Sequence, residues 1–108
     1  MPRRVLPRCH KGEGDLDFTA VLDGETAKGR HLNFVHDDIL RPGVSIGVHS
    51  HERDEEYYLV LTGRGTMRLD GARYDISAGD IAAVYPGGSH GLDNTGTADM
   101  RIIVFSIS

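Results

Sequence analysis

Residues 43–63 read Gly-Val-Ser-Ile-Gly-Val-His-Ser-His-Glu-Arg-Asp-Glu-Glu-Tyr-Tyr-Leu-Val-Leu-Thr-Gly, and this stretch indicates both fold and chemistry. It opens with apolar side chains that alternate with small or polar ones, as in a half-buried β-strand. His49 and His51 follow, two residues apart. Because alternate side chains of a strand share one face, we expect both imidazoles to point the same way. A turn over 52–54 would then bring Glu56 back beside them on a paired strand.

A second polar stretch lies further along the chain. Residues 79–94 read Gly-Asp-Ile-Ala-Ala-Val-Tyr-Pro-Gly-Gly-Ser-His-Gly-Leu-Asp-Asn, and they contribute His90. Three imidazoles and one carboxylate suit a divalent transition metal, for which histidine is the commonest protein ligand. The sequence therefore predicts one metal ion, which could be Mn, Fe, Zn or Ni, held by His49, His51, Glu56 and His90.

The spacing of these residues resembles the two motifs of the cupin superfamily, in the manner of small single-domain bacterial cupins. The matching residues span about half of the chain and are Gly43, His49, His51, Glu56, Gly63, Gly79, Pro86, Gly87, His90 and Asn94. The six residues between Glu56 and Gly63 select Glu56 over its neighbour Glu55, which should face the opposite side of the strand. One departure is Tyr85, which stands where the family usually has proline. This exchange is expected to alter a loop or a pocket wall.

The fold class follows from composition and from the resemblance together. The chain has 108 residues, 14 glycines and four prolines, and no stretch has a sustained helical period. Short apolar runs alternate with turn signals, which predicts an all-β domain, and Asp70-Gly71 is typical of a type I′ hairpin turn. The expected strands are 18–22, 31–35, 44–49, 57–62, 66–69, 72–76, 80–85, 91–94 and 100–107. The resemblance implies the cupin double-stranded β-helix, a jelly-roll barrel of two packed antiparallel sheets.

Residues 1–17 have no period and are interpreted as an N-terminal arm, with the barrel domain at 18–108. The arm is basic, so it could meet an anionic partner or simply be a solvated or subunit-crossing segment. The second interpretation is favoured because no aromatic residues are interleaved. An arm from a partner subunit could cover apolar strand faces that point away from the metal, namely Val44, Ile46 and Val48, and Leu59 and Leu61. We therefore expect a homodimer.

Several partners and compartments are disfavoured by composition. The net charge of −4 argues against a nucleic-acid surface, and no apolar run is long enough to span a bilayer. The first residues lack the apolar core of a signal peptide, and the single Cys9 cannot form an internal disulfide. A cytoplasmic protein is expected. His36 is placed in a turn with Asp37 and Asp38, from which it could reach the pocket rim, and Cys9 is interpreted as an inert thiol.

Two functions remain open from the sequence. The first is a metal-dependent enzyme that acts on a small oxygen-rich metabolite such as a sugar, a hydroxy acid or a keto acid. The resemblance implies isomerase, lyase, decarboxylase or dioxygenase chemistry for such an enzyme. The second is a non-catalytic module that binds a sugar-like small molecule beside a structural metal. The side chains expected around the metal are Tyr58, Asp54 and Tyr85, with Tyr57 and Arg41 as further candidates.

Overall fold

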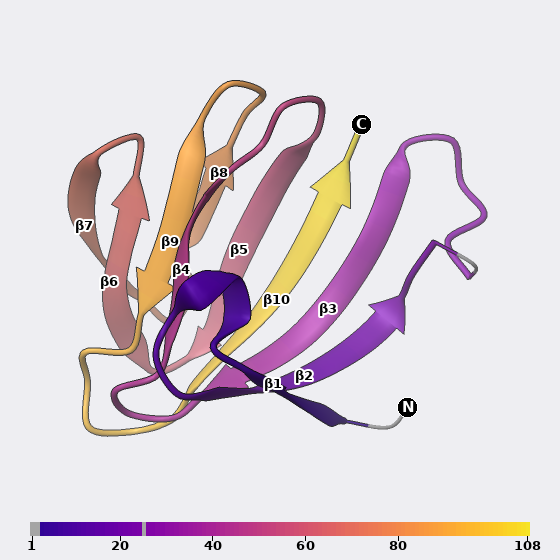
Figure 1. Ribbon diagram of the computed structural model, residues 1–108. Helices are drawn as coiled ribbons and strands as arrows, with labels where there is room; N and C mark the ends of the chain where they lie inside the picture. Colours follow the sequence, from indigo (N-terminus) through magenta and orange to yellow (C-terminus); the bar gives the residue numbers. More distant parts are fainter. Residues whose placement is uncertain (1–2, 25) are drawn as a thin grey trace.

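The computed structural model describes residues 3–24 and 26–108, which form two antiparallel sheets that face each other (Figure 1). One sheet has six strands in the order β1-β2-β3-β10-β5-β8, and the other has four in the order β4-β9-β6-β7. The strands are β1 (Arg4–Pro7), β2 (Asp15–Leu22), β3 (Leu32–Leu40), β4 (Ser45–Ser50), β5 (Glu55–Thr62), β6 (Arg64–Leu69), β7 (Ala72–Ser77), β8 (Ile81–Val84), β9 (Ser89–Asp93) and β10 (Met100–Ile107). The predicted all-β class and the two antiparallel sheets are confirmed.

Helical structure is limited, within the described residues, to one 3-10 turn, η1 (Cys9–Lys11). No helix in that part of the chain has the length and apolar character needed to cross a membrane.

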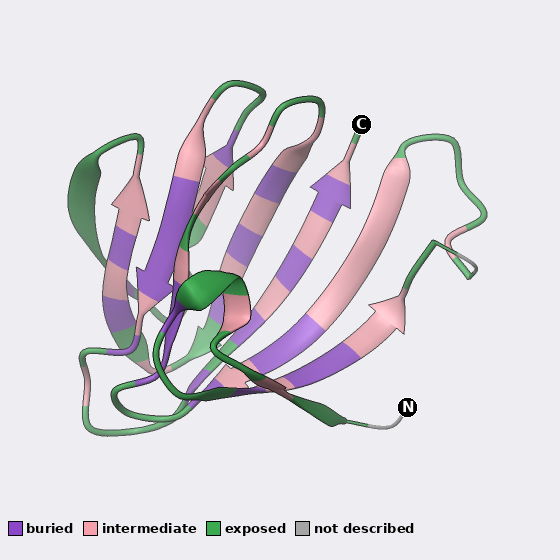
Figure 2. Cartoon of the chain, viewed as in Figure 1, coloured by how far each residue is buried: buried purple, intermediate pink, exposed green. Residues whose placement is uncertain are grey.

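The core lies between the two sheets and is built from alternating side chains. Figure 2 shows this alternation along β5 and β10, where buried positions follow partly exposed ones. β10 lies between β3 and β5, and its inward side chains Met100, Ile102 and Val104 are buried. Period-2 alternation places every second side chain on one face. This pattern predicted a strand over 100–107, and the structure confirms both bounds.

The hairpin between β6 and β7 also matches its prediction. Asp70 and Gly71 have φ angles of 49° and 84°, and Leu69 pairs with Ala72 across the turn. Positive φ at both central residues defines a type I′ turn, which fits the twist of the flanking strands.

β3 is longer than the sequence indicates, and the predicted turn at His36, Asp37 and Asp38 is wrong. All three residues lie within β3, where they pair with β2 and β10. Acidic residues usually favour turns. Here the Arg101 guanidinium donates hydrogen bonds of 3.0 and 2.6 Å to Asp37, so an ion pair keeps that carboxylate on the outer face of the sheet.

A β-bulge in β4 overturns the predicted row of outward apolar side chains. Ile46 pairs with Leu92 and His49 with His90, so β4 uses three steps where β9 uses two. The extra residue turns Ile46 toward the interior together with His49. Val48 is left on the outside, with 49% of its surface exposed.

The segment interpreted as an arm packs on its own chain over residues 3–17; Met1 and Pro2 lie outside the described residues. β1 pairs with β2, and η1 lies beside β4 across the mouth of the barrel (Figure 1). The N-terminal segment and β4 approach each other closely at Gly12 and Gly47, because glycine has no side chain. A Cβ on either residue would meet backbone atoms of the opposing segment. The backbone groups of Glu13 are held by Ser45, with two hydrogen bonds of 2.8 Å.

The loop before β10 supplies a test of the fold. Asn94 is 3% exposed, and its amide nitrogen donates to the carbonyl oxygens of Leu40 and Ala98 at 2.8 and 2.9 Å. We expect Asn94→Ala to lower the free energy of unfolding by about 1–3 kcal/mol, because the buried carbonyl of Leu40 and the carbonyl of Ala98 lose their donor. Urea denaturation measures this. Thr97→Ala, at an exposed position of the same loop, is the control and should change the value by less than about 0.5 kcal/mol.

Candidate metal centre

Four side chains of metal-ligand type converge between the two sheets. His49 lies on β4, His51 directly after it, His90 on the neighbouring β9, and Glu56 on β5 of the opposite sheet. One donor atom from each lies within 4.8 Å of all the others. These are the four residues that the sequence predicted, and their arrangement is consistent with a single metal site. Glu55 accepts a hydrogen bond from the Tyr57 hydroxyl at 2.8 Å instead, so β5 directs Glu56 alone into the cluster.

The separations between donor atoms fit a single ion. Nε2 of His90 lies 3.0 Å from Nε2 of His51 and 3.1 Å from Nε2 of His49. It lies 3.1 Å from Oε1 of Glu56. Two donors that each sit about 2.1 Å from an ion are about 3.0 Å apart at a right angle and about 3.4 Å apart at a tetrahedral angle. The three separations from His90 match right angles, whereas Nε2 of His49 and Oε1 of Glu56 are 3.9 Å apart, which corresponds to a wider angle.

Hydrogen bonds at the far side of two rings favour metal binding. Nδ1 of His49 donates to the carbonyl oxygen of Gly47 at 2.8 Å, and Nδ1 of His51 donates to Asp54 at 2.9 Å. A neutral imidazole has one N–H, so Nε2 of both rings carries a free lone pair.

These lone pairs point at Nε2 of His90, which also meets Glu56. One N–H on His90 can satisfy only one of three acceptor contacts. A cation at the centre removes the remaining repulsion, so the donor set fits a metal.

Burial and charge set the protonation of the cluster. Burial raises the pKa of Glu56, but the neighbouring imidazoles of His49, His90 and His51 outweigh it and hold this pKa at about 2. Burial lowers the pKa of His90, against the opposing effect of Glu56. At neutral pH the site therefore presents an ionised carboxylate and a neutral buried imidazole, which are the forms that bind metal.

The three residues expected around the metal differ in position. Asp54 supports His51 and accepts a 2.6 Å hydrogen bond from the Ser106 hydroxyl. Tyr58 is buried and stacks on the His90 ring, with centroids 4.5 Å apart. Tyr85 lies outside the cluster: 57% of its surface is exposed and its ring faces Tyr57. Arg41 is also remote, since it pairs with Asp17.

A cavity of about 240 Å³ adjoins the cluster inside the barrel. It is lined by Leu6, Cys9, His10, Leu16, Phe18, Phe34, His36, Asp38, Ile46, Glu56, Tyr58 and Val104. Glu56 belongs to both the cluster and the cavity wall, so a molecule in the cavity lies next to the predicted metal. The volume is below the ~300–1,000 Å³ of sites for drug-sized ligands, which favours a small metabolite.

Three polar residues of this cavity were not among the predicted site residues, although His36 was considered for the pocket rim. His10 stacks on His49 with ring centroids 3.6 Å apart, although it lies in the predicted arm. His36 and Asp38 point inward from β3 because that strand continues through them. The signal that could have found both is the alternation of Phe34, His36 and Asp38, which share one face of an extended strand. Cys9 is half-buried, and burial raises the pKa of its thiol, in keeping with an inert cysteine.

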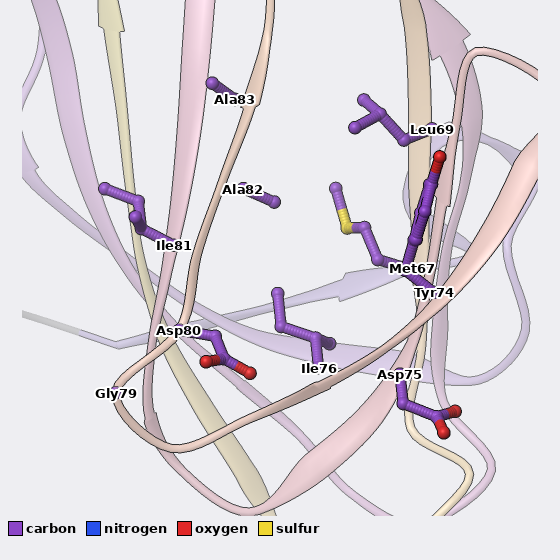
Figure 3. Close-up of a pocket in the computed structure, with 10 residues that line it drawn as sticks. All are labelled: Met67, Leu69, Tyr74, Asp75, Ile76, Gly79, Asp80, Ile81, Ala82 and Ala83. Atoms are coloured by element: carbon purple, nitrogen blue, oxygen red, sulfur yellow. The ribbon is translucent and has the colours of Figure 1, made fainter.

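A larger hollow of about 660 Å³ lies elsewhere, between β7 and β8 at the edges of the two sheets. Figure 3 shows apolar side chains such as Met67, Ile76 and Ile81 along it, with Asp75 and Asp80 at one end. None of the clustered histidines lines it, so it does not take part in the metal centre.

The contact between Asp54 and His51 can be tested through metal affinity. We expect Asp54→Ala to weaken metal binding about 10–100-fold, because the carboxylate orients the ring and raises its basicity. Asp54→Asn keeps an acceptor oxygen and should recover part of this loss. Competition with a chelating dye measures the affinity, and Glu52→Ala, at an exposed position of the same turn, is the control. Unchanged affinity in Asp54→Ala would contradict the assignment.

Comparison with known proteins agrees with the geometry. Residues 38–106 match the family model described as "Cupin domain". An oxalate-binding protein from Thermotoga maritima is 32% identical over 106 residues, which cover 98% of this chain and 86% of that protein.

Two solved structures extend the comparison. A predicted oxalate decarboxylase from Thermotoga maritima superposes with a TM-score of 0.94 at 28% identity, covering 99% of this chain and 92% of that one. A Cupin 2 conserved barrel domain protein from Salinispora arenicola gives a TM-score of 0.73 at 26% identity, covering 86% and 76%. The fold, the clustered ligands and these matches together show that the chain belongs to the cupin family.

Proposed function

We propose that this cupin binds one divalent transition-metal ion and, through it, a small molecule with two adjacent oxygen donors, of which oxalate is the type. The observation that carries the proposal is the convergence of three imidazole Nε2 atoms and one carboxylate beside a small cavity. The relative named as an oxalate-binding protein supports this ligand class.

The metal would supply a Lewis acid with positions open to oxygen ligands. If the ion is six-coordinate, the four protein donors would leave two positions that a chelating ligand would fill. The residues of this chain confine the ligand. Phe18, Phe34 and Ile46 make most of the cavity wall apolar, while Glu56 keeps one side charged. Long apolar ligands do not fit a space of about 240 Å³.

An enzymatic reaction on the chelated ligand is the second candidate function. It is favoured by ionisable side chains, Asp38 and Tyr58, on the wall of the same cavity. Turnover would be established if the metal-loaded protein consumes oxalate and this consumption stops after the metal is chelated. Metal-dependent binding without turnover would establish the binding module.

The dimer remains a proposal. Val48, Leu61 and Ile81 are large apolar side chains that are exposed on the single chain. They support the association of two copies, although the segment 3–17 covers its own sheet rather than a partner's.

Metal content tests whether the protein binds the ion through these four residues. His49→Ala combined with His51→Ala should remove most of the bound metal, and Glu56→Ala should lower occupancy. Glu55→Ala is the matched control, because the adjacent carboxylate points away from the cluster. Elemental analysis of the purified proteins gives both the occupancy and the identity of the ion. Full occupancy in the double variant would overturn the site.

The same measurement has a defined pH dependence. Metal should dissociate as pH falls below about 6, because imidazoles must be neutral to bind it. Glu56 stays ionised across this range because its pKa is about 2, so the loss reports the histidines.

Thermal unfolding tests the ligand class. Oxalate at about 100 times its dissociation constant should stabilise the metal-loaded protein by about 2.7 kcal/mol, a rise in Tm on the order of 10 °C. The rise should vanish with EDTA and in Glu56→Ala. Equal rises with and without metal would contradict binding through the ion.

A further inference from the structure

A buried carboxyl group lies in the wall of the cavity beside the metal centre. Asp38 is 3% exposed, and its Oδ1 atom is buried without a hydrogen-bond partner among the described residues. A backbone hydrogen bond from Thr19 reaches the same carboxyl group. Buried polar atoms almost always have a partner, so an unsatisfied one on a cavity wall indicates a missing partner, either a water or a ligand group.

The side chains around Asp38 explain why this group differs from Asp37. Asp37 points to the other face of β3, where Arg101 and Arg3 pair with it. The charged and titratable groups nearest Asp38 are His36 and Asp37 on its own strand, Arg3, Cys9 and His10 from the N-terminal segment, and Glu56 and Tyr58 from β5. No ion pair joins Asp38 to a cation within the described residues.

None of the neighbours on the cavity side forms a hydrogen bond with Oδ1 of Asp38. His36 packs between aromatic rings, stacked on Phe34 at 4.2 Å and edge-on to Phe18 at 4.4 Å. The Val104 and Leu16 side chains that share the wall are apolar. Oδ1 of Asp38 is therefore left without a partner from the described residues and stays open to a hydrogen bond with a molecule in the cavity.

We propose that Asp38 is the second anchor of the metal-chelated ligand, and that its protonated carboxyl group donates a hydrogen bond to a ligand oxygen facing the cavity. This inference rests on the proposed function, because the ligand is positioned by the metal. It narrows the ligand class to small carboxylates that keep a free oxygen after chelation, as oxalate does.

The electrostatics of the cavity agree with this geometry. Burial raises the pKa of Asp38 to about 7, despite the hydrogen bond from Thr19. An ionised carboxylate would repel an anionic ligand, whereas a neutral carboxyl donates to it. Binding of the anion should therefore be strongest below this pKa and weaken as pH rises through it.

The experiment compares oxalate binding to metal-loaded wild-type protein and two variants by calorimetry, between about pH 6.5 and 8.5, with metal occupancy measured at each pH. Asp38→Asn keeps a donor and the shape of the side chain but cannot ionise. Above the pKa of Asp38, the ratio of wild-type to Asp38→Asn affinity should fall as pH rises, by up to about tenfold per pH unit. Titration of metal-bound water affects both proteins and cancels in their ratio.

A second variant separates hydrogen bonding from charge. Asp38→Leu fills the space without a donor and should weaken oxalate binding about 10–100-fold at pH 6.5, with metal occupancy unchanged. Asp75→Asn, which removes an exposed carboxylate on β7, should follow the wild type at every pH.

The outcomes keep the two proposals distinct. If the wild type binds metal but no oxalate, the proposed function fails. If it binds oxalate and the ratio of wild-type to Asp38→Asn affinity does not change with pH, the role of Asp38 is refuted. A wild-type affinity that rises with pH relative to Asp38→Asn would also refute it, since the carboxylate would then accept rather than donate.

Discussion

The mutual repulsion of four electron-rich donors, held within 4.8 Å of one another, is the constraint around which this barrel is organised. His49 and His90 come from the four-stranded sheet and Glu56 from the six-stranded sheet, so the cluster joins the two layers. The surroundings hold the donors in place. The Gly47 carbonyl and Asp54 orient two rings, Tyr58 stacks on the third, and Ser106 in turn supports Asp54. Such support is what a preorganised metal site requires.

The parts of this structure that the sequence predicted depend on local geometry. His49 and His51 follow from strand alternation, and Asp70-Gly71 follows from the positive φ angles that a two-residue hairpin needs. The errors have distant causes. β3 continues through Asp37 because Arg101, 64 residues away, pairs with it. A bulge opposite Gly91 reverses the alternation at Ile46. The local sequence around either residue does not reveal this bulge. Tyr85 was placed by family spacing, and its ring lies on the outside.

The cavity combines two environments that proteins seldom place side by side. One wall carries the ionised Glu56, which belongs to the metal cluster, and the remainder is lined by aromatic and aliphatic side chains with Asp38 among them. The N-terminal segment completes the enclosure with Cys9 and His10, held in left-handed backbone at Arg8, His10 and Lys11. These conformations are unfavourable for residues with a Cβ, so tertiary packing against β4 must hold them.

The central position of β10 has a consequence for how the chain folds. β3 and β5 do not touch through hydrogen bonds until β10 inserts between them, and its partners lie 39 to 75 residues earlier in the sequence. Loop closure over such separations slows folding, and the open edges of β3 and β5 are exposed meanwhile. During synthesis the six-stranded sheet cannot be completed before β10 leaves the ribosome. His49, His51 and His90 all precede β10 in the chain, so the three imidazoles are synthesised before the strand that fixes β5 and its Glu56 in the sheet.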